Sequence, residues 1–182
     1  MRGRYWLLLL LLSPVVLARA EDPETKSPAG AEEAKPPKAK REIRLAVIVN
    51  AKNPITKVSF GQLRAYLKMS RQFWPNRKRC DLYLPPHTTD AYAILLDKVY
   101  KTTHKKLQKY WVRKLFSGDI PAKPSYAPSA AAAVSLIKKY EGALTVLPAD
   151  LVPKGVKVLL IDGKKPGDDK YPLVGLPRAK KK

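Results

Sequence analysis

Cysteine and histidine are nearly missing from this chain of 182 residues, and their scarcity excludes several kinds of site. Cys80 is the only cysteine, so no disulfide can form within the chain, and the fold must be held by its hydrophobic core. Because Cys80 adjoins a predicted strand, we expect a buried thiol. His87 and His104 are the only histidines, and with one cysteine they cannot complete a zinc site. We predict no metal site.

The common catalytic motifs are absent as well. The sequence has no Gly-x-Ser-x-Gly nucleophile turn, no Walker phosphate loop and no Gly-x-Gly-x-x-Gly dinucleotide loop. No other set of nucleophile, base and acid stands out. We therefore expect a protein that is not an enzyme and that uses no cofactor.

Acidic residues are scarce relative to basic ones. The chain has 36 lysines and arginines against 15 aspartates and glutamates, which gives a formal net charge of +21. A field of this strength attracts anions of any size. Phosphate, nucleic acid, lipopolysaccharide and anionic lipid are all candidate partners, and composition alone does not distinguish among them.

Large apolar residues are unevenly distributed along the chain. Residues 1–20 combine two early arginines, an apolar run over 5–12 and a small-x-small ending, which predicts a signal peptide. The protein is then secreted, and periplasmic if it comes from a Gram-negative bacterium. Residues 21–42 have almost no large apolar side chain, which predicts a disordered linker. Residues 43–176 suffice for one domain, and 177–182 form a basic tail.

Within this domain, strand patterns alternate with helix patterns. Residues 43–49, 79–84, 143–147 and 156–161 resemble strands, with one more short strand at 171–174. Ser59 and Gln62 form a predicted capping box at the start of the first helix. A second predicted helix covers 89–102, and the helical pattern continues through 104–115. A third covers 130–140, with Ser129 before it as the N-cap and Gly142 after it as the C′ glycine. This order predicts an α/β fold with a mixed sheet flanked by helices.

The best candidate site is His87, Thr88, Thr89 and Asp90. A short strand ends at Pro85, and the two threonines stand where the next helix begins. Hydroxyl groups and the amides of a helix start donate to an oxyanion, and Asp90 could accept a proton from one such as phosphate. The spacing alone favours a simpler role, in which a threonine only caps the helix. A ligand site requires that the threonines open to solvent.

A second candidate surface is basic. The side chains that could contact a polyanion are Lys98, Lys101, Lys105, Lys106, Lys109 and Arg113. Such a charged face is more often simply solvated. Four aromatic residues could stack on nucleic-acid bases, but their amphipathic spacing favours packing in the core: Trp74, Tyr110, Trp111 and Phe116. No nucleic-acid-binding motif is present, so nucleic acid is not an expected partner.

The order of several short motifs resembles the phosphate-binding component of phosphate ABC transporters, among the type 2 periplasmic binding proteins. The matching residues are 46–50 with 53–54, then 58–63, 73–76, 88–89, 110–111 with 115–118, 141–144, 156–163 and 171–173. Together these motifs cover nearly all of residues 43–176.

This resemblance implies a secreted α/β domain built like one lobe, with parts of the second, of a two-lobed binding protein. It implies phosphate or another small oxyanion as ligand and a membrane transporter or another envelope protein as partner. The Ser/Gly/Thr-rich turn that the family has ahead of the first strand is missing, and the turn at residues 84–89 lacks the family's arginine and glycine. We therefore expect weak binding at a reduced site, or a protein-interaction module that has lost its ligand.

Overall fold

The computed structural model describes residues 41–178, and strands alternate with helices along most of them, as the sequence predicts. The predicted leader, 1–20, lies outside the described residues. Of the predicted linker, 21–42, only residues 41 and 42 are described, and of the predicted tail, 177–182, only residues 177 and 178. Within the described part, no helix has both the length and the hydrophobicity that crossing a membrane requires.

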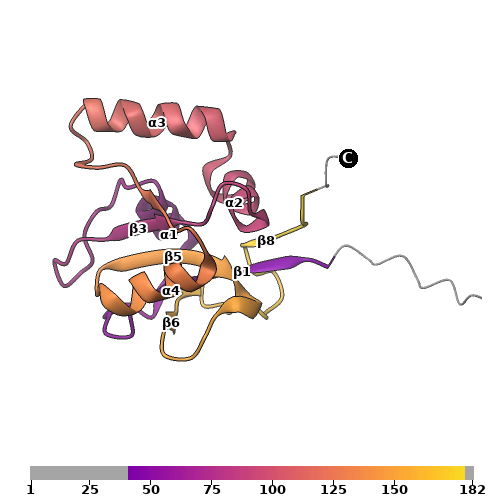
Figure 1. Cartoon of the computed structure of the whole chain (residues 1–182). Helices are drawn as coiled ribbons and strands as arrows, with labels where there is room; N and C mark the ends of the chain where they lie inside the picture. Colours follow the sequence, from indigo (N-terminus) through magenta and orange to yellow (C-terminus); the bar gives the residue numbers. More distant parts are fainter. Residues whose placement is uncertain (1–40, 179–182) are drawn as a thin grey trace, which may run out of the picture. The chain divides into compact units, whose positions relative to one another are not determined.

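The strands and helices are shown in Figure 1. The strands are β1 (Ile43–Val49), β2 (Lys57–Val58), β3 (Asp81–Leu84), β4 (Ser125–Tyr126), β5 (Ala143–Pro148), β6 (Lys157–Val158), β7 (Leu160–Ile161) and β8 (Val174–Gly175). The helices are α1 (Phe60–Leu67), α2 (Asp90–Leu95) with its π-helical continuation η1 (Leu96–Tyr100), α3 (His104–Phe116), α4 (Ala130–Lys139) and the 3-10 turn η2 (Ala149–Leu151).

The main sheet is mixed. Its order is β4-β3-β5-β1-β6, with β8 also paired to β1, while β2 and β7 form a small separate sheet. Strands β3, β4 and β5 are parallel, and β1 runs antiparallel to β5, β6 and β8. The predicted mixed sheet is thereby confirmed, and β1 and β5 lie side by side in its middle (Figure 1).

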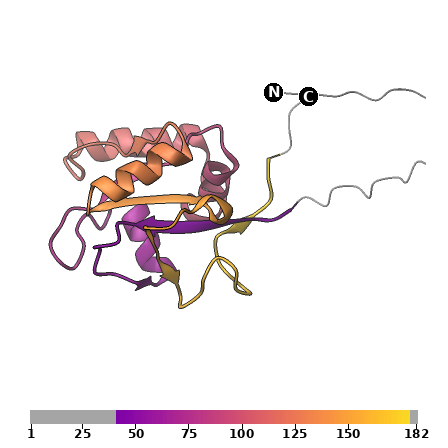
Figure 2. The ribbon, with the colours of Figure 1, turned by 60° about the horizontal axis from the view of Figure 1, so that its bottom comes forward.

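Both faces of β1 are covered, which explains why this strand is apolar throughout. Leu45, Val47 and Val49 belong to the core under α1 and α2, whereas Ala46 and Ile48 belong to the core under α4. Figure 2 shows α1 and α4 on opposite sides of the sheet, with α4 in orange. A strand that is buried on both faces loses the polar-apolar alternation of a half-exposed strand.

The helix starts follow the predicted caps. Ser59 accepts a hydrogen bond from the amide of Gln62, whose side chain in turn accepts one from the amide of Ser59, so the capping box is confirmed. Ser129 caps α4 through the amide of Ala132, also as predicted. Each cap satisfies an amide that the first helical turn leaves without a partner.

The predicted helix over residues 89–115 is interrupted. Lys101 takes a left-handed conformation, with φ of 53°, directly after η1. Thr103 then caps a new helix, α3, through the amide of Lys106. Because a left-handed residue reverses the direction of the chain, α3 is a separate element, and it lies at the top of Figure 1.

The assignment of Gly142 as a C′ glycine is wrong. Tyr140 ends α4 in an extended conformation, and Gly142 has no positive φ. Gly142 is needed for a close approach instead, because a Cβ there would lie 2.0 Å from the carbonyl oxygen of Arg79. Tyr140, the last residue of the predicted helix over 130–140, is 40% exposed.

Three strand boundaries also differ from the predictions. The predicted strand over 156–161 is divided at Leu159 between β6 and β7, which belong to different sheets. The short strand expected at 171–174 lies at Val174–Gly175. Strand β4 lies within a proline-rich stretch where no strand was predicted, and it is only two residues long.

Candidate functional site

A cleft of about 730 Å³ lies at the carboxyl edge of three parallel strands. It is lined by the residues that follow β3, β4 and β5, and by the start of the antiparallel β1: Ile43, Arg44, Pro85, Pro86, Thr88, Thr89, Asp90, Ala91, Pro128, Ser129, Ala130, Leu147, Pro148, Ala149, Asp150 and Leu151. In open α/β sheets, ligands bind at this edge, because the chain leaves each strand there and turns into a helix.

Proline occurs where each of these three strands ends. Pro85 follows β3, Pro148 is the last residue of β5, and Pro128 stands two residues beyond β4. Proline has no amide hydrogen, so it cannot continue a strand ladder. The strands therefore stop together, and the space beyond them stays open as the cleft.

Two helices begin at the rim of the cleft. The amides of Asp90 and Ala91 in α2 and of Ala130 in α4 make no hydrogen bond within residues 41–178. Amides in the first turn of a helix have no partner in that helix and carry its positive dipole end. Three such donors from two helices line one cleft, and this arrangement favours a negatively charged group.

The two predicted threonines have different roles. The hydroxyl of Thr89 donates to the carbonyl oxygen of Pro86 at 2.7 Å and accepts from the amide of Tyr92 at 3.3 Å, so it acts as the cap of α2. Thr88 is exposed, lines the cleft, and makes no side-chain hydrogen bond within the described residues. Thr88 is therefore the threonine whose hydroxyl can reach a ligand.

The charges around the cleft are mixed. Arg44 is half-buried, and one of its guanidinium nitrogens donates to the carbonyl oxygen of Gly167 at 2.9 Å, which fixes the side chain at the rim. Asp90 accepts a hydrogen bond from the amide of Arg178 at 2.9 Å, and Asp150, which also lines the cleft, is exposed. A ligand that carries both acceptor oxygens and a proton fits this mixture better than a fully ionised one.

His87 lies outside the lining of the cleft, although the sequence grouped it with Thr88. Its ring stacks on that of His104, with centroids 5.4 Å apart. The Nδ1 atom of His104 lies 2.9 Å from the hydroxyl of Tyr92, which also approaches the hydroxyl of Tyr126 at 3.4 Å. Burial, followed by the hydrogen bond to Tyr126, raises the pKa of Tyr92 far above its ordinary value. This cluster links α2, α3 and β4.

The predicted basic face divides into two parts. Lys98 is half-buried and pairs with Asp97 at 3.0 Å, and the hydrogen bond from Lys98 lowers the pKa of that carboxyl group. Lys101 is exposed at the chain reversal. The others lie exposed along α3: Lys105, Lys106, Lys109 and Arg113.

The aromatic residues also divide into two groups. Trp74 and Trp111 are buried and Tyr110 is half-buried, in agreement with the expected core packing. Phe116 is 86% exposed and takes no part in the core.

Sequence reasoning missed Arg44, Ser129 and the residues around Pro148 as parts of the cleft. They come from segments far from Thr88 along the chain. The parallel alignment of β3, β4 and β5 brings Ser129 and Pro148 to the cleft, and the antiparallel pairing of β1 with β5 brings Arg44 there. The signal that could have found Ser129 is its own cap position, which gives α4 the same start as α2. Within residues 41–178, no group of three or more histidine, cysteine, aspartate or glutamate side chains could hold a metal ion.

Comparison with known proteins identifies the fold. No protein-family model matches the chain, and no curated protein matches it in sequence. An ABC-type phosphate transport receptor from Vibrio cholerae has a similar structure over 75% of this chain and 55% of its own, with 16% identity and a TM-score of 0.60. PstS from Borrelia burgdorferi is similar over 75% and 56%, with 12% identity and a TM-score of 0.58.

A third solved structure is described as a phosphate ABC transporter substrate-binding protein with bound phosphate, from Clostridium perfringens. It is similar over 68% of this chain and 47% of its own, with 12% identity and a TM-score of 0.55. The chain thus spans about half the length of the receptors that it matches. At these identities the likeness shows the fold: an α/β domain with a mixed sheet, like that of phosphate-transport receptors, as the resemblance implied.

Proposed function

We propose that this chain is a non-enzymatic binding domain that holds a small oxyanion, phosphate first of all, in the cleft beyond β3, β4 and β5. The observation that carries the proposal is the convergence of two helix starts on one cleft, with unpaired amides from Asp90, Ala91 and Ala130. Amides of this kind bind phosphate in many proteins. The similarity to receptors named for phosphate transport supports the same ligand.

Each side chain at the rim has a definite part in this proposal. The hydroxyl groups of Thr88 and Ser129 donate to phosphate oxygens, since both are exposed and face the cleft lining. The guanidinium of Arg44 neutralises charge, because an arginine forms strong charge-assisted hydrogen bonds with phosphate. Asp90 accepts a hydrogen bond from the hydroxyl group that phosphate still carries near neutral pH. Water competes for the ion at the open side, so binding is weak.

The proposed use of this binding is in transport. The solved receptors are named as parts of phosphate transport systems, and delivery to a membrane transporter is the role we propose for this domain. The predicted leader would place that role outside the cytoplasmic membrane.

Thermal unfolding of the full chain with phosphate tests the binding proposal. Phosphate at about ten times its dissociation constant should stabilise the fold by about 1.4 kcal/mol and raise Tm by several degrees. Thr88→Ala should remove most of this gain, and Thr88→Ala with Thr89→Ala should abolish it. The Thr89 change also removes a helix cap worth about 1 kcal/mol, so each gain is measured against the variant's own Tm without phosphate.

Matched variants and ions decide the outcome. Thr88→Ser keeps the hydroxyl and should keep the gain. Thr56→Ala removes an exposed threonine outside the cleft and should change nothing. Equal gains from phosphate, sulfate and chloride would mean that no specific site exists.

A further inference from the structure

Three exposed apolar side chains gather at one end of α3. Phe116 is 86% exposed, Val112 40% and Leu115 36%. The other large apolar residues with comparable exposure are scattered over the described residues: Phe73, Tyr126, Tyr140, Leu151 and Leu176. A single exposed apolar side chain is ordinary, whereas a group of them on one helix favours an interaction surface.

Basic residues surround this group. At about 100° per residue, Lys105, Lys109, Val112, Arg113 and Phe116 point to the same outward side of α3. Leu107 and Trp111 point to the opposite side and are buried. The helix contains no acidic residue at all. We call these five outward residues the α3 outer face.

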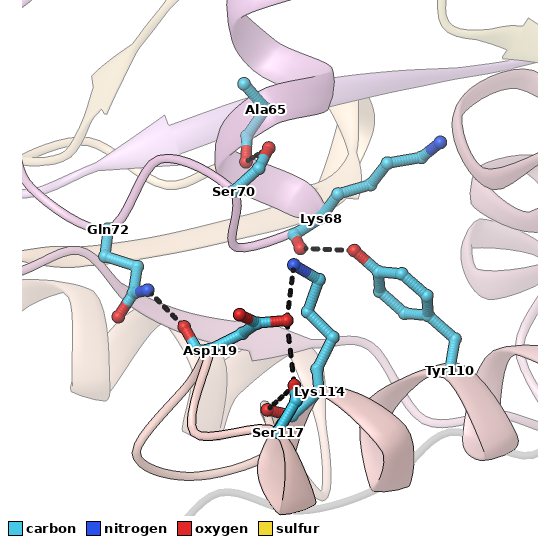
Figure 3. Close-up of polar contacts among 8 residues, drawn as sticks. All are labelled: Ala65, Lys68, Ser70, Gln72, Tyr110, Lys114, Ser117 and Asp119. Carbon is cyan, nitrogen blue, oxygen red and sulfur yellow. Dashed lines mark hydrogen bonds and ion pairs between the residues drawn. The ribbon is translucent and has the colours of Figure 1, made fainter.

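The carboxylates nearest to this helix in the sequence are already paired. Asp119 accepts a hydrogen bond from the hydroxyl of Ser117 at 2.8 Å and lies 3.4 Å from the ammonium of Lys114 (Figure 3). The hydrogen bond from Ser117, followed by Lys114, lowers the pKa of Asp119. Asp97 is paired with Lys98. The positive charge of the outer face is therefore not neutralised from within.

The helix is also fixed in its rotation. The hydroxyl of Tyr110 donates to the carbonyl oxygen of Lys68 at 3.0 Å, and the side chain of Gln72 donates to the carbonyl oxygen of Asp119 at 2.7 Å (Figure 3). Burial of Trp111 holds the same side inward. Val112 and Phe116 cannot turn into the core without breaking these contacts, so they remain on the surface.

We propose that the α3 outer face docks on an anionic phospholipid surface. Lys105, Lys109 and Arg113 contact headgroup phosphates, while Val112 and Phe116 enter the boundary between headgroups and acyl chains. Basic residues beside aliphatic and aromatic ones are the pattern of an interfacial helix. A single-stranded nucleic acid offers stacking for Phe116 but no contact for the aliphatic Val112, so lipid fits this face better. The proposal does not depend on the anion cleft.

Vesicle binding by the full chain tests the charge part of this proposal. Wild-type protein is compared with a Lys105→Gln, Lys109→Gln, Arg113→Gln variant on vesicles of phosphatidylcholine alone or with phosphatidylglycerol. Each cation near such a surface contributes about fivefold in affinity, so the triple variant should bind the anionic vesicles at least tenfold more weakly. A control with equal charge loss elsewhere, Lys138→Gln, Lys154→Gln, Lys165→Gln, should bind within about threefold of wild type. Equal loss in both variants would overturn the proposal.

A position-specific probe tests the apolar part. Cys80 is only 3% exposed, so an environment-sensitive dye placed on Phe116→Cys labels that position selectively. Its emission should shift to the blue with anionic vesicles, whereas a dye on Leu151→Cys, at the cleft, should not respond. All samples share residues 1–40, so any membrane affinity of that segment cancels. An unshifted dye on bound protein, or tighter binding to single-stranded oligonucleotides than to vesicles, would refute the proposal.

Discussion

At the scale of single residues, Gly142 shows how a local pattern can be recognised and misinterpreted. Its position after α4 suggested a C′ glycine, but its real constraint comes from residues far away in sequence. Its carbonyl oxygen accepts hydrogen bonds from the indole of Trp74 at 2.9 Å and from the amide of Asp81 at 3.0 Å. The carbonyl of Arg79 leaves no room for a side chain there. Gly142 thereby joins the start of β5 to the loop that precedes β3.

We therefore expect Gly142→Ala to destabilise the domain by roughly 2–4 kcal/mol, because the new methyl group must displace backbone. Gly61→Ala is the matched control. Its Cβ would meet nothing closer than 3.8 Å in the first turn of α1, so the change should be neutral or stabilising by up to about 1 kcal/mol. Urea unfolding of both variants measures the difference, and a similar stability for the two would contradict this account.

Local chemistry was predictable where the partners are close along the chain. The capping box of Ser59 and Gln62 and the cap of Ser129 each involve residues three apart, and both are confirmed. A cap role for one of the two threonines, Thr88 or Thr89, was also recognised, because helix starts have a clear local signature, and the structure assigns it to Thr89. The exposure of Thr88 could not be foreseen, since it depends on the loops after β4 and β5.

At the scale of elements, α3 has two sides with different roles. Leu107 and Trp111 pack into the core, while Phe116 at its last turn touches solvent. Amphipathic spacing predicted the inward side of the helix, but it also assigned Phe116 to the core. Phe116 follows Val112 by about one helical turn, so it lies on the outward side of α3 and not on the side of Leu107 and Trp111.

This division predicts opposite results for two aromatic substitutions in one helix. Trp111→Ala should lower the free energy of unfolding by about 3–5 kcal/mol, because it leaves a large cavity. Phe116→Ala should change it by less than about 0.5 kcal/mol, as expected for a surface residue. Chemical denaturation followed by circular dichroism measures both. A large loss with Phe116→Ala would show that the exposed ring stabilises the fold after all.

The candidate cleft was predictable only in part, because it depends on a strand that the sequence did not reveal. The turn after β3 was recognised from Pro85, Thr88 and Thr89, which are neighbours in sequence. Strand β4 has only two residues and no apolar pattern, so the local sequence did not predict it. Without β4, the start of α4 could not be aligned with that of α2, and Ser129 stayed outside the predicted site.

At the scale of the whole molecule, six tyrosines share one property. Burial raises the pKa of their hydroxyl groups above the ordinary value: Tyr66, Tyr83, Tyr92, Tyr100, Tyr110 and Tyr171. The folded state therefore favours the neutral hydroxyl. This contribution to stability is fully present below the ordinary pKa of 10.0 and declines as the pH rises above it. The domain should unfold in alkali together with ionisation of these tyrosines.

Tyr100 offers a direct test, since it is buried and donates to the carbonyl oxygen of Leu67 at 2.8 Å. Tyr100→Phe should cost about 1 kcal/mol at neutral pH through the lost hydrogen bond. The loss of stability between about pH 7 and pH 11 should nevertheless be smaller than in wild type, by about 1 kcal/mol. Lysine ionisation is common to both proteins and cancels. An unchanged pH dependence would show that Tyr100 does not titrate on unfolding.

The position of β1 in the sheet has a consequence for how the protein is made. It is the first strand of the domain, yet all its partners come late: Leu45 pairs with Pro148, Ile48 with Val158, and Arg44 with Val174. Pairings so distant along the chain form slowly. During synthesis this hydrophobic strand therefore emerges from the ribosome long before its strand partners, and in that interval its unpaired backbone is an open binding segment for a chaperone.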